Sequence, residues 1–436
     1  MKIFLFAFAL IFTAVPATAE LKIQQVTSPG GIKAWLVEEH SIPIVSLDVR
    51  FKGGTSLDEP GKSGAIYLMS GLLEEGAGDL TAQDFLRKSE ELASSFGFRA
   101  NGDSVNISAE FLRETTDETV ELLRLALQEP HFDPVAVDRV RAQVISIIAS
   151  DLQDPQSIAS ARFDELAYGA HPYGTPSTGT TDSVNLLTRD DLIAAHRNSM
   201  TRDRMFVGVV GDITAEDLGV VLDNLLGGLP ETGAPMPVRA DVNITGGVTV
   251  VDLPTPQSVA VFGHAGISQD DPDFFAAYVM NQVFGAGGFT SRLTEEVREK
   301  RGLTYGVYSY LASYDLAELY LGGVSSSNET IAEAIDVIRA EWQKMAENGV
   351  TKEELEAAKK YMTGAYPLRF DGNSRIAGIL VGMQMDDLPR SYIANRNGYI
   401  NAVTLEDVAR VAKRLMKPEN LRIVVVGAPE NLVTTD

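Results

Sequence analysis

The sequence predicts an α+β protein of two homologous domains, each a mostly antiparallel sheet with helices packed on one face. Three observations predict this fold class: the length of 436 residues, a segment that occurs twice, and a strand-rich start to each half. A chain of this length is too long for one ordinary domain and fits two domains of about 200 residues each. Two copies of so long a unit indicate a duplicated domain, because a solenoid needs several shorter repeats.

The repeat is clearest at the end of each half. Residues 184–211 and 400–427 match without a gap, at an offset of 216 residues. In each copy a threonine, Thr188 or Thr404, precedes an acidic pair. This pattern is typical of a helix N-cap followed by carboxylates in the first helical turn. Each copy then ends in an apolar strand closed by glycine, so both halves should finish with a helix and a buried strand.

The start of each half also has a counterpart in the other half. Residues 44–51 and 257–264 both have the pattern of strands. The apolar segments 65–69 and 276–280 follow them and resemble each other residue by residue. Each half is therefore expected to begin with strands, continue with helices and end with a helix and a strand.

A junction rich in glycine and proline separates the halves near residues 227–243. Clusters of glycine and proline are typical of a linker. We therefore expect a first domain at 20–230, a linker at 231–244 and a second domain at 245–436.

The first 19 residues are predicted to be a secretory signal peptide. One lysine precedes an apolar run, and Ala17 and Ala19 supply the small residues of a cleavage site. A membrane anchor is the less favoured alternative, because the apolar run is too short to span a bilayer. The mature chain is therefore expected to be exported, to the periplasm if the source is a Gram-negative bacterium, with no membrane insertion after the signal is removed.

The composition excludes several classes of function. Lys and Arg number 37 against 60 Asp and Glu, so the surface should repel nucleic acid and anionic lipid. The chain has no cysteine, which excludes a cysteine nucleophile and any thiolate metal site. A zinc site built on a helix needs two histidines at i and i+4. No helical segment offers such a pair, so the five histidines are expected at the surface or in packing: His40, His131, His171, His196 and His264.

The segment 290–309 closely resembles the second-domain signature of the insulinase (pitrilysin) family of zinc metallopeptidases. It reads Thr-Ser-Arg-Leu-Thr-Glu-Glu-Val-Arg-Glu-Lys-Arg-Gly-Leu-Thr-Tyr-Gly-Val-Tyr-Ser. The strand-rich start of each half and the loop 171–174 also fit, so the resemblance extends over essentially the whole mature chain. It implies an insulinase-like half clamshell made of the two homologous domains.

The resemblance also implies that the zinc site is degenerate. In active members the first domain carries His-x-x-Glu-His on a helix, where both histidines bind zinc and the glutamate activates water. A later glutamate completes the metal site. Alignment on the helix expected at 64–76 puts Tyr67, Ser70 and Gly71 at the motif positions and Ile147 at about the third ligand. All three ligands and the base are thus replaced, which implies no zinc and no other cofactor in this chain.

Arg298 and Tyr305 remain from the family's second-domain motif. The resemblance implies that both side chains face the cavity between the domains, hold the substrate carbonyl and stabilise the oxyanion. We expect the helix to end near Gly302, with Tyr305 on a strand at 304–311 and turned back beside Arg298. From the residues alone, a solvated helical arginine and a strand tyrosine is the competing interpretation.

The leading hypothesis is a non-zinc-binding subunit of an exported peptidase, inactive alone and active with a zinc-bearing partner of the same family. The pair would be a heterodimer or larger and would hydrolyse peptides at the partner's zinc, with Arg298 and Tyr305 acting in trans. A non-catalytic peptide-binding or scaffold subunit is the alternative. An active zinc peptidase is the least favoured, because the ligands are missing.

Overall fold

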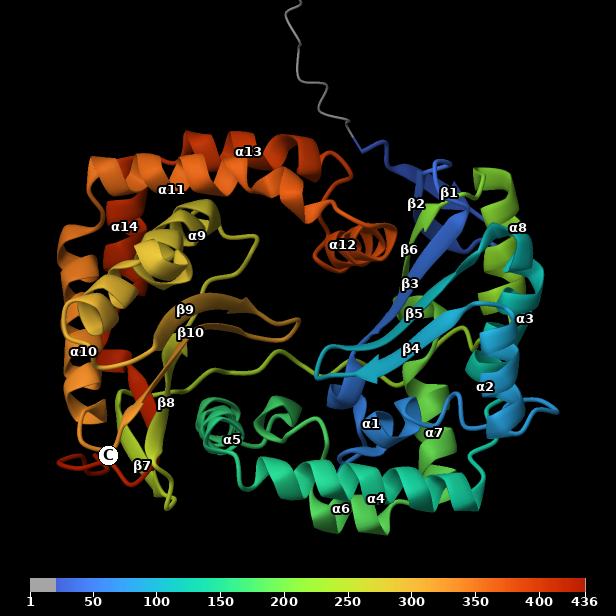
Figure 1. The fold of residues 1–436 in the computed structure, drawn as a ribbon, viewed down its shortest axis with the longest axis horizontal. Coiled ribbons are helices and arrows are strands. Elements are labelled where there is room, and N and C mark those ends of the chain that lie inside the picture. Colours follow the sequence, from blue (N-terminus) through green and yellow to red (C-terminus); the bar gives the residue numbers. More distant parts are fainter. Residues whose placement is uncertain (1–20, 436) are drawn as a thin grey trace, which may run out of the picture.

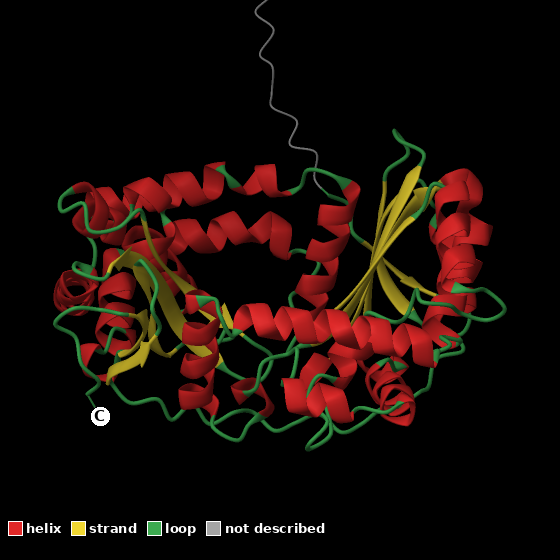
Figure 2. Cartoon of the chain, turned by 60° about the horizontal axis from the view of Figure 1, so that its bottom comes forward, coloured by secondary structure: helices red, strands yellow, loops and turns green. Residues whose placement is uncertain are grey.

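The computed structural model describes residues 21–435. The predicted signal peptide, residues 1–19, lies outside the described residues. Two sheets lie on opposite sides of the molecule, one in each half of the chain, and helices cover the outer side of each (Figures 1 and 2). Within residues 21–435, no helix combines the length and the apolar character that crossing a membrane requires.

The first sheet has six strands in the order β1-β2-β6-β3-β5-β4. Its neighbouring strands are antiparallel except for the parallel pair β2 and β6. Strand β4 therefore lies at one edge. The bounds are β1 (Gln24–Thr27), β2 (Lys33–Glu38), β3 (Ile44–Lys52), β4 (Ser95–Ala100), β5 (Ser104–Leu112) and β6 (Met205–Gly211).

The second sheet has five strands in the order β7-β11-β8-β10-β9, again with one parallel pair, β7 and β11. This order repeats β2-β6-β3-β5-β4 strand for strand, which confirms the prediction of two similarly folded halves. The bounds are β7 (Gly247–Asp252), β8 (Gln257–Ala265), β9 (Gly306–Ser313), β10 (Glu318–Ser327) and β11 (Arg422–Gly427).

Within residues 21–435, the first half has eight α-helices and the second has six. Residues 227–246, which include the predicted linker, contain no helix or strand between the halves. The first half has α1 (Ala65–Ser70), α2 (Ala82–Glu91), α3 (Thr116–Gln128), α4 (Pro134–Asp151), α5 (Pro155–Tyr168), α6 (Thr181–Leu186), α7 (Arg189–Ser199) and α8 (Ala215–Leu226). The second has α9 (Phe274–Asn281), α10 (Ile331–Asn348), α11 (Lys352–Gly364), α12 (Asn373–Met385), α13 (Tyr392–Ala402) and α14 (Leu405–Leu415).

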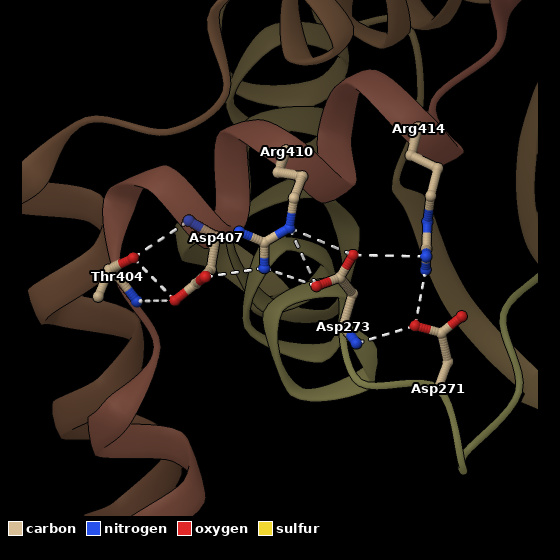
Figure 3. A network of polar contacts seen from close by, with 6 residues as sticks. All are labelled: Asp271, Asp273, Thr404, Asp407, Arg410 and Arg414. Atoms are coloured by element: carbon tan, nitrogen blue, oxygen red, sulfur yellow. Dashed lines mark hydrogen bonds and ion pairs between the residues drawn. The ribbon is translucent and has the colours of Figure 1, made fainter.

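The predicted helix starts at the repeated threonines are confirmed. Thr188 caps α7 and Thr404 caps α14, each with a complete capping box. The backbone N–H of Asp191 donates to the Thr188 hydroxyl at 3.3 Å, and that of Asp407 donates to the Thr404 hydroxyl at 3.1 Å (Figure 3). Each aspartate side chain also accepts a hydrogen bond from the backbone N–H of its threonine, which satisfies a second donor at the helix end.

The two halves exchange one helix each. Helix α5 of the first half packs on β8 and β11, and α12 of the second half packs on β3 and β6 (Figure 1). Gly208 on β6 makes the second contact possible, because a Cβ there would lie 2.5 Å from the Ala377 carbonyl oxygen. The prediction of helices on one face of each sheet is therefore incomplete, since a helix from the other half lies on the inner face.

Candidate functional site

The four positions predicted to have lost the zinc ligands and the base lie together in one pocket. It has a volume of ≈ 430 Å³ and lies where α1 and α4 meet the edge strand β4. Its lining residues are Tyr67, Ser70 and Gly71 of the α1 segment, Phe98, Arg99 and Ala100 of β4, and Val140, Gln143, Val144 and Ile147 of α4.

Helix α1 is shorter than the helix predicted at 64–76. It begins after Gly64, where φ is +89°, and ends at Ser70. The Asp58 carboxylate accepts hydrogen bonds from the backbone N–H of Gly64 at 2.7 Å and of Ile66 at 2.9 Å, which fixes the start. The helix then gives way to turns at residues 71–74.

The side chains at the degenerate positions offer no usual zinc ligand. Tyr67 is half-buried, and the Ser70 hydroxyl donates to the Tyr67 carbonyl oxygen at 2.8 Å. Ile147 is 41% exposed and presents a branched apolar side chain to the pocket. Throughout residues 21–435, no three His, Cys, Asp or Glu side chains are grouped to hold a metal ion.

Gly71 lies close to helix α4. A Cβ at this position would lie 3.3 Å from Cγ1 of Val140 on α4. A larger side chain therefore needs Val140 to move, because interiors are close-packed. Replacing Gly71 alone with histidine would strain the contact between α1 and α4.

Two polar residues of this pocket were missed by the sequence analysis. Gln143 lies one helical turn before Ile147 on α4, and the i, i+4 spacing could have indicated it. Arg99 lies on β4, and no local signal in the sequence connects it to α1. Both side chains can donate hydrogen bonds, so with the Tyr67 phenol the pocket holds donors suited to peptide carbonyl groups.

Arg298 lies in a π-helical segment, Thr294–Glu299, rather than in the α-helix expected there. Its guanidinium lies over the Phe289 ring, with Cζ 4.7 Å from the ring centroid, and Nε is 3.4 Å from the Glu299 carboxylate. The side chain remains 33% exposed. Gly302 closes the segment with φ +66° and donates its N–H to the Arg298 carbonyl at 2.8 Å, which confirms the predicted helix end.

Tyr305 lies in the bend just before β9, not within the strand predicted at 304–311. Its side chain is 87% exposed. Neither Tyr305 nor Arg298 lines the pocket beside α1, and no hydrogen bond joins the two across the described part of the chain. Arg298 and Tyr305 therefore lie outside the α1 pocket in the isolated chain.

The histidines are predicted at the surface or in packing, and His40 lies at the surface with 51% of its side chain exposed. His196 and His264 are buried, and burial lowers the pKa of both imidazoles. Each of the five rings lies within hydrogen-bonding distance of a nearby group. The partners are Asp212 for His40, and the backbone carbonyls of Gly78 for His131, Val238 for His171, Leu127 for His196 and Ala265 for His264.

Comparison with known proteins gives consistent matches. Residues 186–362 match the family described as Peptidase M16 inactive domain. A Helicobacter pylori protein named Non-peptidase homolog YmxG is 25% identical over 391 residues, which cover 89% of this chain and 90% of that protein. A Streptomyces coelicolor protein named Uncharacterized zinc protease SCO5738 is 23% identical over 404 residues, which cover 90% of this chain and 87% of that protein.

Solved structures match along nearly the whole chain. The peptidase M16 inactive domain from Pseudomonas fluorescens has a TM-score of 0.88 and 26% identity, and the match covers 95% of this chain and 99% of that one. A protease from Helicobacter pylori has a TM-score of 0.84 and 18% identity, over 93% of this chain and 100% of that one. The fold is thus common to proteins named for peptidases and for their inactive relatives.

Proposed function

Because this chain belongs to the peptidase M16, or insulinase, family, we propose that it is the non-zinc-binding subunit of a peptidase whose partner subunit carries the zinc. One observation carries the proposal. The positions that hold zinc ligands and the base in active members meet in the α1 pocket as Tyr67, Ser70, Gly71 and Ile147. The chain keeps the fold of a peptidase half, but within residues 21–435 no three His, Asp or Glu side chains are grouped to hold a zinc ion that would activate water.

Arg298 and Tyr305 supply what the chain contributes to the reaction. A guanidinium and a phenol are hydrogen-bond donors, and such donors stabilise the oxyanion that forms when a carbonyl is attacked. The 87% exposure of Tyr305 makes its phenol accessible to a molecule outside this chain. In the proposed complex, both side chains act on a peptide held at the partner's zinc.

The α1 pocket contributes binding rather than chemistry. Strand β4 is the edge of the first sheet and lines the pocket, so an extended peptide can pair with it. Arg99, Gln143 and Tyr67 then lie beside that peptide as hydrogen-bond donors. The acidic surface, with 60 Asp and Glu against 37 Lys and Arg, favours neutral or basic peptides.

The test is peptide cleavage by this chain together with an M16 relative that has an intact His-x-x-Glu-His. The isolated chain should be inert and should hold no zinc by elemental analysis. Tyr305→Phe should lower the activity of the complex by at least about tenfold, because one lost oxyanion donor typically costs more than that. Tyr361→Phe is the matched control, since Tyr361 on α11 is also exposed, at 63%.

A binding assay for the two subunits must accompany the cleavage assay. If Tyr305→Phe weakens cleavage while assembly is unchanged, the tyrosine acts on the substrate. If the double variant Arg298→Ala, Tyr305→Phe cleaves as fast as the unmodified complex, the chain is a peptide-binding or scaffold subunit instead.

We further propose that the protein works outside the cytoplasm after residues 1–19 are removed. This rests on the lysine, the apolar run and the Ala17–Ala19 site in the sequence. N-terminal sequencing of the chain recovered from the exported fraction should begin at Glu20. A chain that retains Met1 in that fraction would contradict the proposal.

A further inference from the structure

A second pocket, distinct from the one beside α1, lies between the two halves. Its volume is ≈ 510 Å³. The first half contributes the turn between β4 and β5, the end of α5 and the loop after it, while the second half contributes the turn between β9 and β10 and the end of α12. The sequence gives no local signal for it, because five segments that are distant in the chain supply its walls, including the end of β3 and the turn after it.

Negative groups outnumber positive groups in this pocket. Four carboxylates line it: Asp103, Asp164, Asp315 and Asp386. Arg50 lines the pocket and Lys52 lies beside Asp315, and both cations already have a carboxylate partner. Lys52 Nζ is 3.3 Å from Asp315 Oδ1, and Arg50 Nε donates to Asp48 Oδ1 at 3.2 Å. Asp164 forms no hydrogen bond or ion pair with any group in residues 21–435.

Burial makes this excess of carboxylates costly. It raises the pKa of Asp164 to about 7 and that of Asp315 to about 6, and it also raises the pKa of Asp103 and Asp386. Desolvation disfavours each ionised carboxylate, and their neighbours share the same sign. A cation in the pocket would offset both effects.

Two buried polar atoms in the pocket lack partners. Tyr168 on α5 is only 6% exposed, and its Oη forms no hydrogen bond within the described chain. Asp315 Oδ2 is likewise buried and without a partner there. Such atoms are rare in native proteins, because a buried polar group without a hydrogen bond costs free energy. Both can bond to a ligand that enters the pocket.

Aromatic rings complete the wall. Tyr173 packs edge-on against Tyr168 at 5.4 Å and against Tyr314 at 5.8 Å between ring centroids. Its hydroxyl donates to Asp103 and accepts from the Leu316 backbone N–H at 3.0 Å, so it joins the two halves. Tyrosine rings attract organic cations through their negative faces.

We propose that this pocket binds an organic cation, an ammonium or guanidinium group, with Asp164 and Tyr168 as its principal contacts. A metal ion fits the pocket less well, because no three of the carboxylates among residues 21–435 are grouped to coordinate one ion. An organic cation can instead reach separated carboxylates and pack against the rings. The group can come from an arginine or lysine side chain of a peptide or from a free polyamine.

Calorimetry on the isolated mature chain at about pH 8, where Asp164 is ionised, tests the proposal. The probes are N-acetyl-Gly-Arg-Gly-amide, its citrulline counterpart and spermidine. We expect the arginine peptide to bind at least about tenfold more tightly than the neutral citrulline peptide, since hydrogen bonds to charged groups are the stronger ones. Asp164→Asn should weaken arginine binding about tenfold. Asp79→Asn, which removes an exposed charge outside the pocket, should have no effect.

Tyr168→Phe keeps the ring and removes only the hydroxyl, so it should weaken binding about fivefold and serves if Asp164→Asn does not fold. Tighter binding of spermidine than of the arginine peptide would assign the pocket to free polyamines. Equal binding of the arginine and citrulline peptides, no binding of any cation, or no effect of either variant would overturn the proposal. No zinc-bearing partner enters the assay, so its outcome is independent of the proposed peptidase role.

Discussion

Helices α5 and α12 have the same place in their halves, but they attach to the opposite sheet by different means. Helix α5 buries large side chains, above all Phe163 at 1% exposure and Tyr168 at 6%, against the second sheet. Helix α12 buries the smaller Ala377 and Leu380 against the first sheet. It adds polar contacts, such as the Gln384 side-chain N–H that donates to the Val207 carbonyl at 2.9 Å.

The comparison shows that the same topology can be stabilised by large apolar contacts, as at α5, or by close packing and hydrogen bonds, as at α12. Apolar area should dominate the free energy of the α5 contact, because burying an aromatic side chain removes much surface from water. The α12 contact depends more on close approach, which Gly208 permits, and on hydrogen bonds. Mutations that remove area should therefore act most strongly on α5, and mutations that add atoms should act on α12.

The largest expected effect comes from Phe163→Ala. Phe163 touches the second sheet closely, since a Cβ on Gly263 would lie 3.2 Å from its ring. Removing the ring should lower the free energy of unfolding by about 4 kcal/mol. Leu380→Ala, at a fully buried residue of α12, should cost about 3 kcal/mol. Denaturant titration measures both, and a larger cost for Leu380→Ala would invert the comparison.

Much of the fold could be predicted because its signals are local. The caps at Thr188 and Thr404, the strand-closing glycines and the duplication are all present in short stretches of sequence. The exchange of α5 and α12 could not be predicted. The apolar face of α5 has the same pattern whichever sheet it covers, so only the tertiary structure assigns it to the second half.

Some residues of the candidate site could also be predicted from the sequence, and others could not. Resemblance to a family motif located Tyr67, Gly71 and Ile147, and these residues do meet in one pocket. The π-helical form around Arg298 was missed, because helix type there depends on packing rather than on residue type. The pocket between the halves was missed because Asp164 and Asp386 are far apart in the chain.

Gly208→Ala should have the next largest effect and acts only on the α12 contact. The added Cβ would lie 2.5 Å from the Ala377 carbonyl oxygen, which belongs to backbone and cannot rotate away. We expect a loss of about 2 to 3 kcal/mol, the usual cost of overpacking. The matched control is Gly398→Ala in α13, where a Cβ meets nothing within 4 Å. It should stabilise the protein by about 0.5 to 1 kcal/mol, and a neutral Gly208→Ala would show that α12 shifts at little cost.

Asp164→Asn tests the pocket that both exchanged helices line, with Asp164 on α5 and Asp386 just after α12. The folded-state pKa of Asp164 is raised to about 7, so the folded protein binds the proton more tightly than the unfolded chain does. Stability is therefore lost as pH rises from about 4 to about 7, and Asn removes this loss.

The Asp164→Asn variant should match the unmodified protein near pH 4 and exceed it by about 2 kcal/mol near pH 8. Denaturant titrations at both pH values measure this. Equal stability at both would mean that the Asp164 carboxylate is already compensated in the free protein.

The smallest expected effect concerns ion pairs on the two capped helices, α7 and α14. In each half, these pairs join the capped helix to the segment just before α1 or α9. In the second half, Asp273 accepts hydrogen bonds from Arg410 on α14 at 2.6 Å and lies 3.4 Å from Arg414 (Figure 3). In the first half the corresponding link is one pair, Lys62 with Asp191 on α7, at 3.1 Å.

Asp273→Asn should therefore cost about 1 kcal/mol, because the buried carboxylate serves two guanidinium groups. Lys62→Met should cost about 0.5 kcal/mol or less, as is usual for a single pair near the surface. High salt should shrink both effects, since each link includes a partly exposed cation. Denaturant titrations of both variants at low and high salt measure the two costs. Equal costs for Asp273→Asn and Lys62→Met would mean that the second arginine adds nothing.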